Sequence, residues 1–232
     1  MLSSLDFLGL FVFLTAWSGY SWLTSYSKWR HKTLSYMMDS HRHAWMRAML
    51  TRQVRIADTN IAAGLQQGTA FFASASLLAI GGAFTFLNAT ENAVMLAKRL
   101  PVPISTDPVL WELKAFGLIL IFAYAFFKFG WAYRLFNYAT IVIGSIPEEV
   151  STENQEAIAA ADRAARLVTL AGKHFSRGQQ ALFFAVGYLG WYAGAEAFIA
   201  STLFVTAVLL RRQFASRARA AAKIKVKPAN LD

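Results

Sequence analysis

Three polar residues interrupt the longest apolar run of the sequence, and they are the first candidates for a chemical role. Lys128, Arg134 and Asn137 lie within residues 115–146. Ionisable side chains are costly inside a membrane and normally face a partner group or water. Arg134 and Asn137 are three residues apart, so one helix face presents both to a carboxylate or a carbonyl. Lys128 and Arg134 have a second interpretation, in which they lie at the lipid headgroups beside an aromatic belt.

Glu196 is the one acidic residue well inside another apolar run, residues 181–210. A carboxylate at that depth either pairs with an arginine or lysine or takes up a proton. Pairing within the chain is one interpretation, and a proton or ion site is the other.

Residues 45–61 have an amphipathic pattern. On a helical wheel, apolar residues cover one half and arginines lie on the other, which predicts a helix at a membrane interface or docked on a partner helix. Gln53 and Asn60 fall within the apolar half. They either hydrogen-bond neighbouring helices or line a polar cavity.

Several kinds of chemistry are disfavoured by the residue types. The chain has no cysteine, which excludes thiol nucleophiles, disulfides, thiolate zinc sites and iron–sulfur clusters. His41 and His43 are two residues apart and face away from each other on a helix, without acids that would complete a metal site. No dinucleotide fingerprint, phosphate loop or nucleophile elbow occurs. We therefore predict no catalytic, metal or cofactor-binding residues, and we expect that the protein is not an enzyme.

Composition indicates a membrane protein. Of 232 residues, 56% are hydrophobic and 16% are charged, whereas an ordinary soluble domain has roughly 25% charged residues. The apolar blocks are about 20 residues long, the length that a helix needs to cross the hydrocarbon layer. The net charge of +10 is concentrated beside these blocks, so we expect anionic lipid headgroups, and not nucleic acid, as the partner of the basic segments.

The predicted fold is all-α, a single membrane domain of residues 1–232 with four transmembrane helices and membrane-proximal amphipathic helices, in the cell (inner) membrane. Three prolines between residues 88 and 108 predict a connecting loop. The spans are placed at residues 5–26, 69–88, 115–136 within a long helix to 146, and 181–210, followed by a basic tail at 211–232.

A membrane-proximal layer is predicted from three segments. The long helix extends beyond one membrane thickness and stops before Pro147. Residues 153–171 form a polar, alanine-rich helix that begins with a capping box at Thr152 and ends near Gly172. This helix and residues 45–61 are the candidates that cover the extension.

The sidedness of the chain stays open at this stage. Residues 28–67 hold seven Lys/Arg and two Asp, and residues 211–232 hold seven Lys/Arg and one Asp. Four spans place these basic segments on opposite faces, against the positive-inside tendency. A fifth span, made by folding residues 115–146 back near Lys128, would place both inside.

Two pairs of glycines have the spacing that lets membrane helices approach closely. They are Gly64 with Gly68 and Gly190 with Gly194. Internal packing and oligomer contact are both open for each pair.

Three stretches resemble the family of membrane proteins called domain of unknown function 599. They are AWMR at 44–47 leading through Asp58 and Ile61 to GTAFFAS at 68–74, the pattern from Phe129 through YRLFNY at 133–138 to Ile146-Pro147, and RGxxALFFA at 177–185 followed by Trp191. The resemblance implies a four-helix membrane protein without assigned activity. It adds weight to Arg134, Asn137, Arg177 and Gly178, and it carries over no catalytic or cofactor residue.

Two functions are consistent with these patterns. The first is a non-enzymatic oligomeric or accessory structural component that binds a second copy or a partner membrane subunit. The alternative is a small-ion or metabolite channel or transporter that uses Lys128, Arg134 and Glu196. The candidate buried polar network comprises Gln53, Asn60, Lys128, Arg134, Asn137, Arg177 and Glu196.

Overall fold

The computed structural model describes residues 2–97, 107–147 and 154–223, and these residues form helices and short connections without a strand. The α-helices are α1 (Ser4–Ser25), α2 (Leu34–Met49), α3 (Ile56–Asn88), α4 (Thr90–Ala97), α5 (Pro108–Gly144), α6 (Gln155–Leu189), α7 (Ala195–Phe214) and α8 (Arg217–Ala221). Two 3-10 helices, η1 (Lys28–Lys32) and η2 (Gly190–Ala193), make tight connections.

Helix starts are set by short polar side chains. Ser3 caps α1 through a capping box with Asp6, and Asp107 caps α5 with proline at its first turn, both of which satisfy free backbone N–H groups. Asn154 caps α6 by accepting from two backbone N–H groups. The capping box predicted at Thr152 lies outside the described residues.

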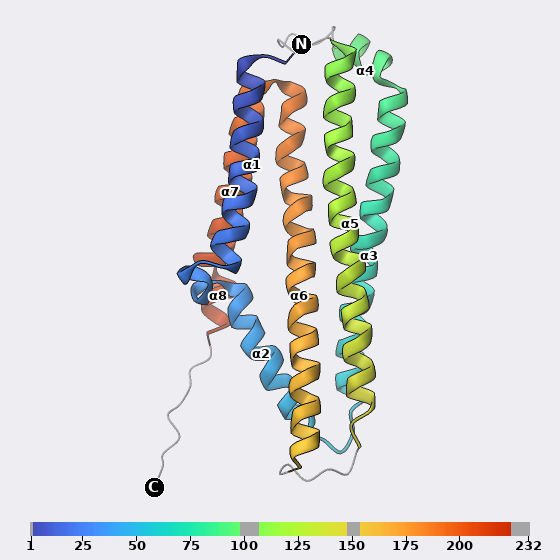
Figure 1. Ribbon diagram of the computed structural model, residues 1–232, viewed down its shortest axis with the longest axis vertical. Coiled ribbons are helices and arrows are strands. Elements are labelled where there is room, and N and C mark those ends of the chain that lie inside the picture. The colour runs from blue at the N-terminus through green and yellow to red at the C-terminus, as the bar shows by residue number, and fades with distance from the viewer. Residues whose placement is uncertain (1, 98–106, 148–153, 224–232) are drawn as a thin grey trace.

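Helices α1, α7, α6, α5 and α3 lie side by side in the upper half of the molecule (Figure 1). Helices α1 and α7 lie on one side of α6, and α5 and α3 lie on the other side. Four helices are long and apolar enough to cross a membrane, namely α1, α3, α5 and the stretch Ala195–Ala221. At about 1.5 Å per residue, the 22 residues of α1 match a hydrocarbon layer of about 30 Å.

The C-terminal half of α6 lies among these four helices as an inner helix. Its residues Gly178, Ala181, Phe184, Ala185 and Tyr188 are buried. Because neighbouring helices shield it from lipid, it can be shorter and less apolar than a lipid-facing span.

The polar helix and the last predicted span have other boundaries in the structure. Helix α6 does not end near Gly172 but continues to Leu189, and the apolar run 181–210 is broken before α7. Gly194 has φ of +130°, a conformation that favours glycine. The sequence predicts one span there because a turn made by apolar and small residues does not lower the mean hydropathy.

Residues 45–61 are also not one helix. Helix α2 ends at Met49 and α3 begins at Ile56. The chain reverses between them, and Arg55 donates to the carbonyl oxygens of Ile146 and Pro147 at 2.5 and 2.6 Å. Met46, Met49 and Leu50 before the break are buried in a core, whereas Val54, Ile56 and Ile61 after it are exposed, so the apolar half of the wheel does not form one buried face.

This second core lies in the lower half of the molecule. Methionines of α2, the C-terminal half of α5 and the alanine face of α6 meet there. The apolar extension of α5 is thereby covered outside the layer of five helices. The buried residues are Met46, Met49, Leu50, Leu135, Phe136, Ala139, Ile143, Ile146, Ala157, Ala160, Ala161, Ala164, Ala165, Val168 and Ala171.

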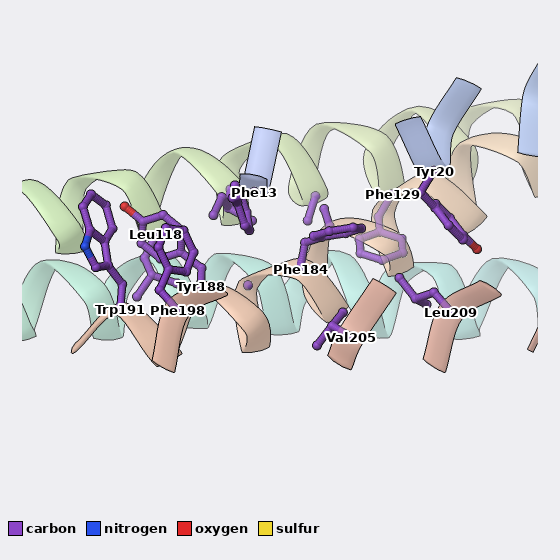
Figure 2. Packing of buried hydrophobic residues seen from close by; sticks show 14 of the residues in the cluster. Phe13, Tyr20, Leu118, Phe129, Phe184, Tyr188, Trp191, Phe198, Val205 and Leu209 are labelled. Atoms are coloured by element: carbon purple, nitrogen blue, oxygen red, sulfur yellow. The ribbon is translucent and has the colours of Figure 1, made fainter. Parts of the chain in front are cut away.

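The core of the upper half is aromatic (Figure 2). Phe13 of α1 makes an edge contact with Phe184 of α6 at 5.7 Å between ring centroids. Trp191 stacks on Phe198 of α7 at 5.1 Å. Interlocking rings of this kind fix the relative positions of α1, α6 and α7.

The first basic segment and the described part of the second, residues 211–223, lie on the same side of the upper layer. Arg219 donates to the Lys32 carbonyl oxygen at 2.6 Å, and His41 bonds the Ala222 carbonyl oxygen at 3.0 Å. The two segments therefore do not lie on opposite faces of the layer, which is the arrangement that four spans alone would require. The turn at Gly194 brings the chain back across the layer. The fifth span that would fold back near Lys128 does not form, because α5 continues through Lys128 as one helix.

Candidate functional site

Most residues of the predicted buried network lie on the surface and apart from one another. Gln53, Asn60, Arg134 and Glu196 are exposed. The network is therefore not assembled in the interior of the described residues. For Gln53, Asn60 and Glu196, the sequence prediction assumed continuous helices that the structure breaks. Arg134 lies on the unbroken helix α5, and its side chain is on the exposed face of that helix.

Arg134 lies at an aromatic surface instead of pairing with an acid among the described residues. Its Nε donates to the Tyr138 hydroxyl at 2.6 Å. The guanidinium also lies 5.8 Å from the Trp131 ring centroid, within the range of cation–π attraction. Asn137, half-buried on the same helix, does not share this contact. The arrangement agrees with the interpretation of an aromatic belt at the headgroups.

Glu196 is in the first turn of α7 and is exposed. A carboxylate there lies near the positive end of the helix dipole. The predicted depth was wrong because Gly194 ends the preceding turn only two residues earlier. Glu196 is consequently a border residue and not a charge inside a span.

Lys128 and Arg177 are the two predicted residues that the structure brings together. Lys128 lies 5.0 Å from the Tyr124 ring centroid on α5, and Arg177 of α6 donates to the Tyr26 hydroxyl at 3.4 Å. His174 lies one turn from Arg177 on α6. Burial, together with the positive charges of Lys128 and Arg177, lowers the pKa of His174.

Sequence reasoning missed a charged contact at the opposite end of the layer. Lys114 is 2% exposed and donates to the Trp191 carbonyl oxygen at 2.8 Å. The Trp191 indole donates to Asp6 Oδ1 at 2.6 Å. In the sequence, Lys114 lies directly before the run 115–146. The hydropathy pattern therefore assigns this lysine to the flank of the span and not to its interior.

A second missed contact ties α2 to α3. Asp58 is fully buried and accepts from the Trp45 indole at 2.7 Å and from Arg52. Its position beside an arginine-rich face was visible in the sequence, but the turn that buries it was not. This contact is at the end of the molecule away from the spans and holds the turn between the two helices.

A cleft of about 740 Å³ lies between α1, α2, α6 and α7, where α1 and α7 end. Its walls carry five cationic side chains and one acidic side chain, together with several hydroxyl and amide groups. The cationic residues are Arg30, Arg42, Lys173, Arg177 and Arg212, and the acidic residue is Asp39. A concave surface with this charge balance attracts anions.

Close packing and an ion pair hold one wall of the cleft. Arg42 Nη1 lies 2.6 Å from Asp39 Oδ1, and Lys173 Nζ lies 3.9 Å from Asp39 Oδ2. A β-carbon on Gly172 would lie 2.6 Å from Arg42 Nη2, so glycine leaves room for the Arg42 guanidinium beside α6. Burial raises the pKa of Asp39, and the charges of Arg42 and Lys173 offset part of this shift.

Amide side chains hold the other walls. Gln180 of α6 donates to Ser21 Oγ of α1 at 2.7 Å. Gln213 of α7 donates to Ser35 Oγ of α2 at 3.1 Å. These bonds cross between helices, so the walls of the cleft are fixed by the fold.

Residues 8–218 match the model of the family described as "Protein of unknown function, DUF599". The chain belongs to this family. The match confirms the resemblance seen in the sequence, and it reaches from the second turn of α1 into α8. No curated protein and no solved structure matches the chain.

The cleft is a concave polar surface built from the described residues of this DUF599 protein. Arginine offers paired N–H donors that match carboxylate and phosphate oxygens, and lysine adds a point charge. The described residues contain no group of three His, Asp or Glu side chains arranged for a metal ion. What the arrangement can do chemically is hold an anion at the level where the helices leave the membrane.

Proposed function

We propose that this DUF599 protein is a structural or accessory component of the cell (inner) membrane and not an enzyme, and that it works as a homo-oligomer or with a partner membrane subunit. The observation that carries the proposal is the pair of fixed cores, one aromatic and one rich in alanine. Contacts between aromatic rings build the first core, and small side chains that let helices pack closely build the second. Such an interior supports a rigid scaffold.

The orientation follows from the basic residues. Lys28, Arg30, Arg211 and Arg212 lie where α1 and α7 end. Positive residues are enriched in short cytoplasmic loops. The lower half of the molecule therefore faces the cytoplasm in this proposal, and the ends of α1 and α7 that carry Asp6 and Glu196 face the outside.

The surface of α3 supports oligomer contact. A β-carbon on Gly64 or Gly68 would meet nothing within 4 Å, so this glycine pair faces outward. Gly190, by contrast, is packed against Ser201 and the Ala197 carbonyl oxygen inside the chain. Small outward residues let a neighbouring membrane helix approach closely.

The oligomer is tested by replacing the outward glycines. Gly64→Leu with Gly68→Leu should convert the assembled species into monomers when the protein is cross-linked in native membranes. Gly130→Leu is the matched control, because Gly130 on α5 is also exposed with open space around it. A monomeric parent protein, or equal cross-linking of all three proteins, would refute the homo-oligomer.

A channel or transporter is the second candidate, and the buried Lys114 near Asp6 favours it. An ionisable residue inside a span is a functional-site hypothesis by default. Purified protein in liposomes should show no flux of Na⁺, K⁺, Cl⁻ or protons above that of empty liposomes. A flux that Lys114→Met abolishes would replace the structural proposal with this one.

A further inference from the structure

We propose that the basic cleft is a binding site for a phosphate ester, carried by the headgroup of an anionic phospholipid. Arg30, Arg42, Lys173, Arg177 and Arg212 line this cleft, whose volume is about 740 Å³. The site goes beyond the proposed structural function and does not depend on it. A free phosphate offers the same chemistry, and the experiment below separates the two sources.

The position of the cleft favours a lipid. Helix α1 ends at Ser25 and α7 ends at Phe214, so the cleft opens where two spans leave the hydrocarbon layer. Tyr20, Phe183 and Leu209 line it on the side of the spans. A headgroup among the arginines would thus keep its acyl chains beside apolar side chains.

The charges of the cleft fit a phosphate. Arg30 and Arg212 are exposed, and the Arg212 guanidinium lies 5.1 Å from the Phe183 ring centroid, which holds it at the mouth. Arg42 is held against Asp39 and is only 23% exposed. Guanidinium groups bind phosphate oxygens through paired, charge-assisted hydrogen bonds.

Hydroxyl groups complete the polar lining. Thr24 and Ser25 of α1 and Ser176 of α6 contribute to the same walls. The cross-helix bonds of Gln180 and Gln213 fix these walls before a ligand arrives. A preorganised site loses less entropy on binding than a cluster of flexible surface lysines.

The neighbouring basic residues supply a matched control. Lys28 is two positions from Arg30, and Arg211 is adjacent to Arg212, yet neither lines the cleft. All four side chains are exposed at the same level. If anionic lipid binds only through general charge attraction, replacing either pair weakens binding equally. If the cleft is a specific site, replacing Arg30 and Arg212 weakens binding more than replacing Lys28 and Arg211.

The experiment compares the full-length parent with Arg30→Gln/Arg212→Gln and with Lys28→Gln/Arg211→Gln in a neutral detergent. Each protein is titrated with short-chain phosphatidylglycerol, short-chain phosphatidylcholine or inorganic phosphate. The rise in melting temperature is measured against the same protein without ligand, so a change in basal stability does not enter the comparison. A ligand that binds the folded state raises this temperature.

We expect phosphatidylglycerol to stabilise the parent and the Lys28/Arg211 variant equally. The apparent affinity of the Arg30/Arg212 variant should be weaker by on the order of tenfold or more, as the loss of charge-assisted hydrogen bonds implies. Equal affinities for both double variants, or equal effects of phosphatidylcholine and phosphatidylglycerol, would overturn the site. An equal effect of inorganic phosphate at the same concentration would overturn the lipid as its source and identify a soluble anion.

Discussion

The indole of Trp191 donates a 2.6 Å hydrogen bond to Asp6 and thereby joins η2, between α6 and α7, to the first turn of α1. Lys114 of α5 donates to the carbonyl oxygen of the same tryptophan at 2.8 Å. Three separate helical segments therefore meet at Trp191, which is 1% exposed.

Asp6→Asn should destabilise the protein because Lys114 keeps its charge in a buried position. Asparagine removes the negative charge that acts on Lys114 and that strengthens the hydrogen bond from the Trp191 indole, and a hydrogen bond to a charged group contributes about 1.5–3 kcal/mol. The melting temperature in detergent should fall by several degrees. Glu112→Gln, at an exposed acid on α5, should leave it unchanged, and Asp6→Asn combined with Lys114→Met should recover part of the loss. A full-sized loss in the double variant would contradict the coupling.

Gly172→Ala should displace the Arg42 side chain from the wall of the cleft. The new β-carbon would lie 2.6 Å from Arg42 Nη2, so the arginine must leave its place beside Asp39. Gly130→Ala is the comparison, since α5 is open there and alanine favours a helix by about 1 kcal/mol over glycine. Thermal unfolding should show a loss for the first variant and a gain for the second. Stabilisation by both would mean that Arg42 moves without cost.

Acidification should destabilise the protein through His174. The pKa of His174 is lowered by burial and by Lys128 and Arg177, so the folded state holds the proton less tightly than the unfolded chain. The resulting stability is present above pH 6.5, the ordinary value, and is lost as the pH falls through the lowered pKa. Melting temperatures between pH 7.5 and about 5 should fall less steeply for His174→Gln than for the parent. His31→Gln, at an exposed position, should follow the parent; identical slopes for all three would exclude this role of His174.

Arg134→Ala should change stability little, although the sequence alone predicts a large loss. The side chain is exposed and contacts Trp131 and Tyr138. Surface substitutions usually change the free energy of unfolding by about 0.5 kcal/mol or less. A loss of several degrees in the melting temperature would show that Arg134 contacts a buried partner, as the sequence analysis predicted.

Single cysteines should reveal which ends share a side of the membrane. The parent has no cysteine, so each introduced thiol reports alone. Lys28→Cys and Arg217→Cys should react with an impermeant reagent from one side, and Glu196→Cys should react from the other. Labelling of Lys28→Cys and Arg217→Cys from opposite sides would refute the crossing made by the C-terminal half of α6.

Local patterns along the chain are enough to predict the class of the fold and much of its layering. Long apolar blocks predict helices that span a membrane, and the apolar run 115–146 lies on α5. The lower core joins the last turns of α2 with α5 and α6. The sequence predicted that residues 45–61, 115–146 and 153–171 would meet in this way, although only the part of 45–61 up to Leu50 belongs to the core. These features depend on local periodicity and length, which the sequence states directly.

The positions of the turns and the burial of particular charges could not be predicted without the packing of the helices. The breaks at residues 50–55 and at Gly194 are made by residues that also occur inside helices. The hydropathy pattern therefore does not mark them as helix ends. The burial of Lys114 and Asp58 and the exposure of Glu196 then follow from those turns. Arg134 is exposed because it lies on the outer face of α5. A cleft lined by Arg30, Arg177 and Arg212 could not be read from the sequence either, because its walls come from helices that are far apart along the chain. Such long-range contacts depend on packing between helices and not on the pattern within any one of them.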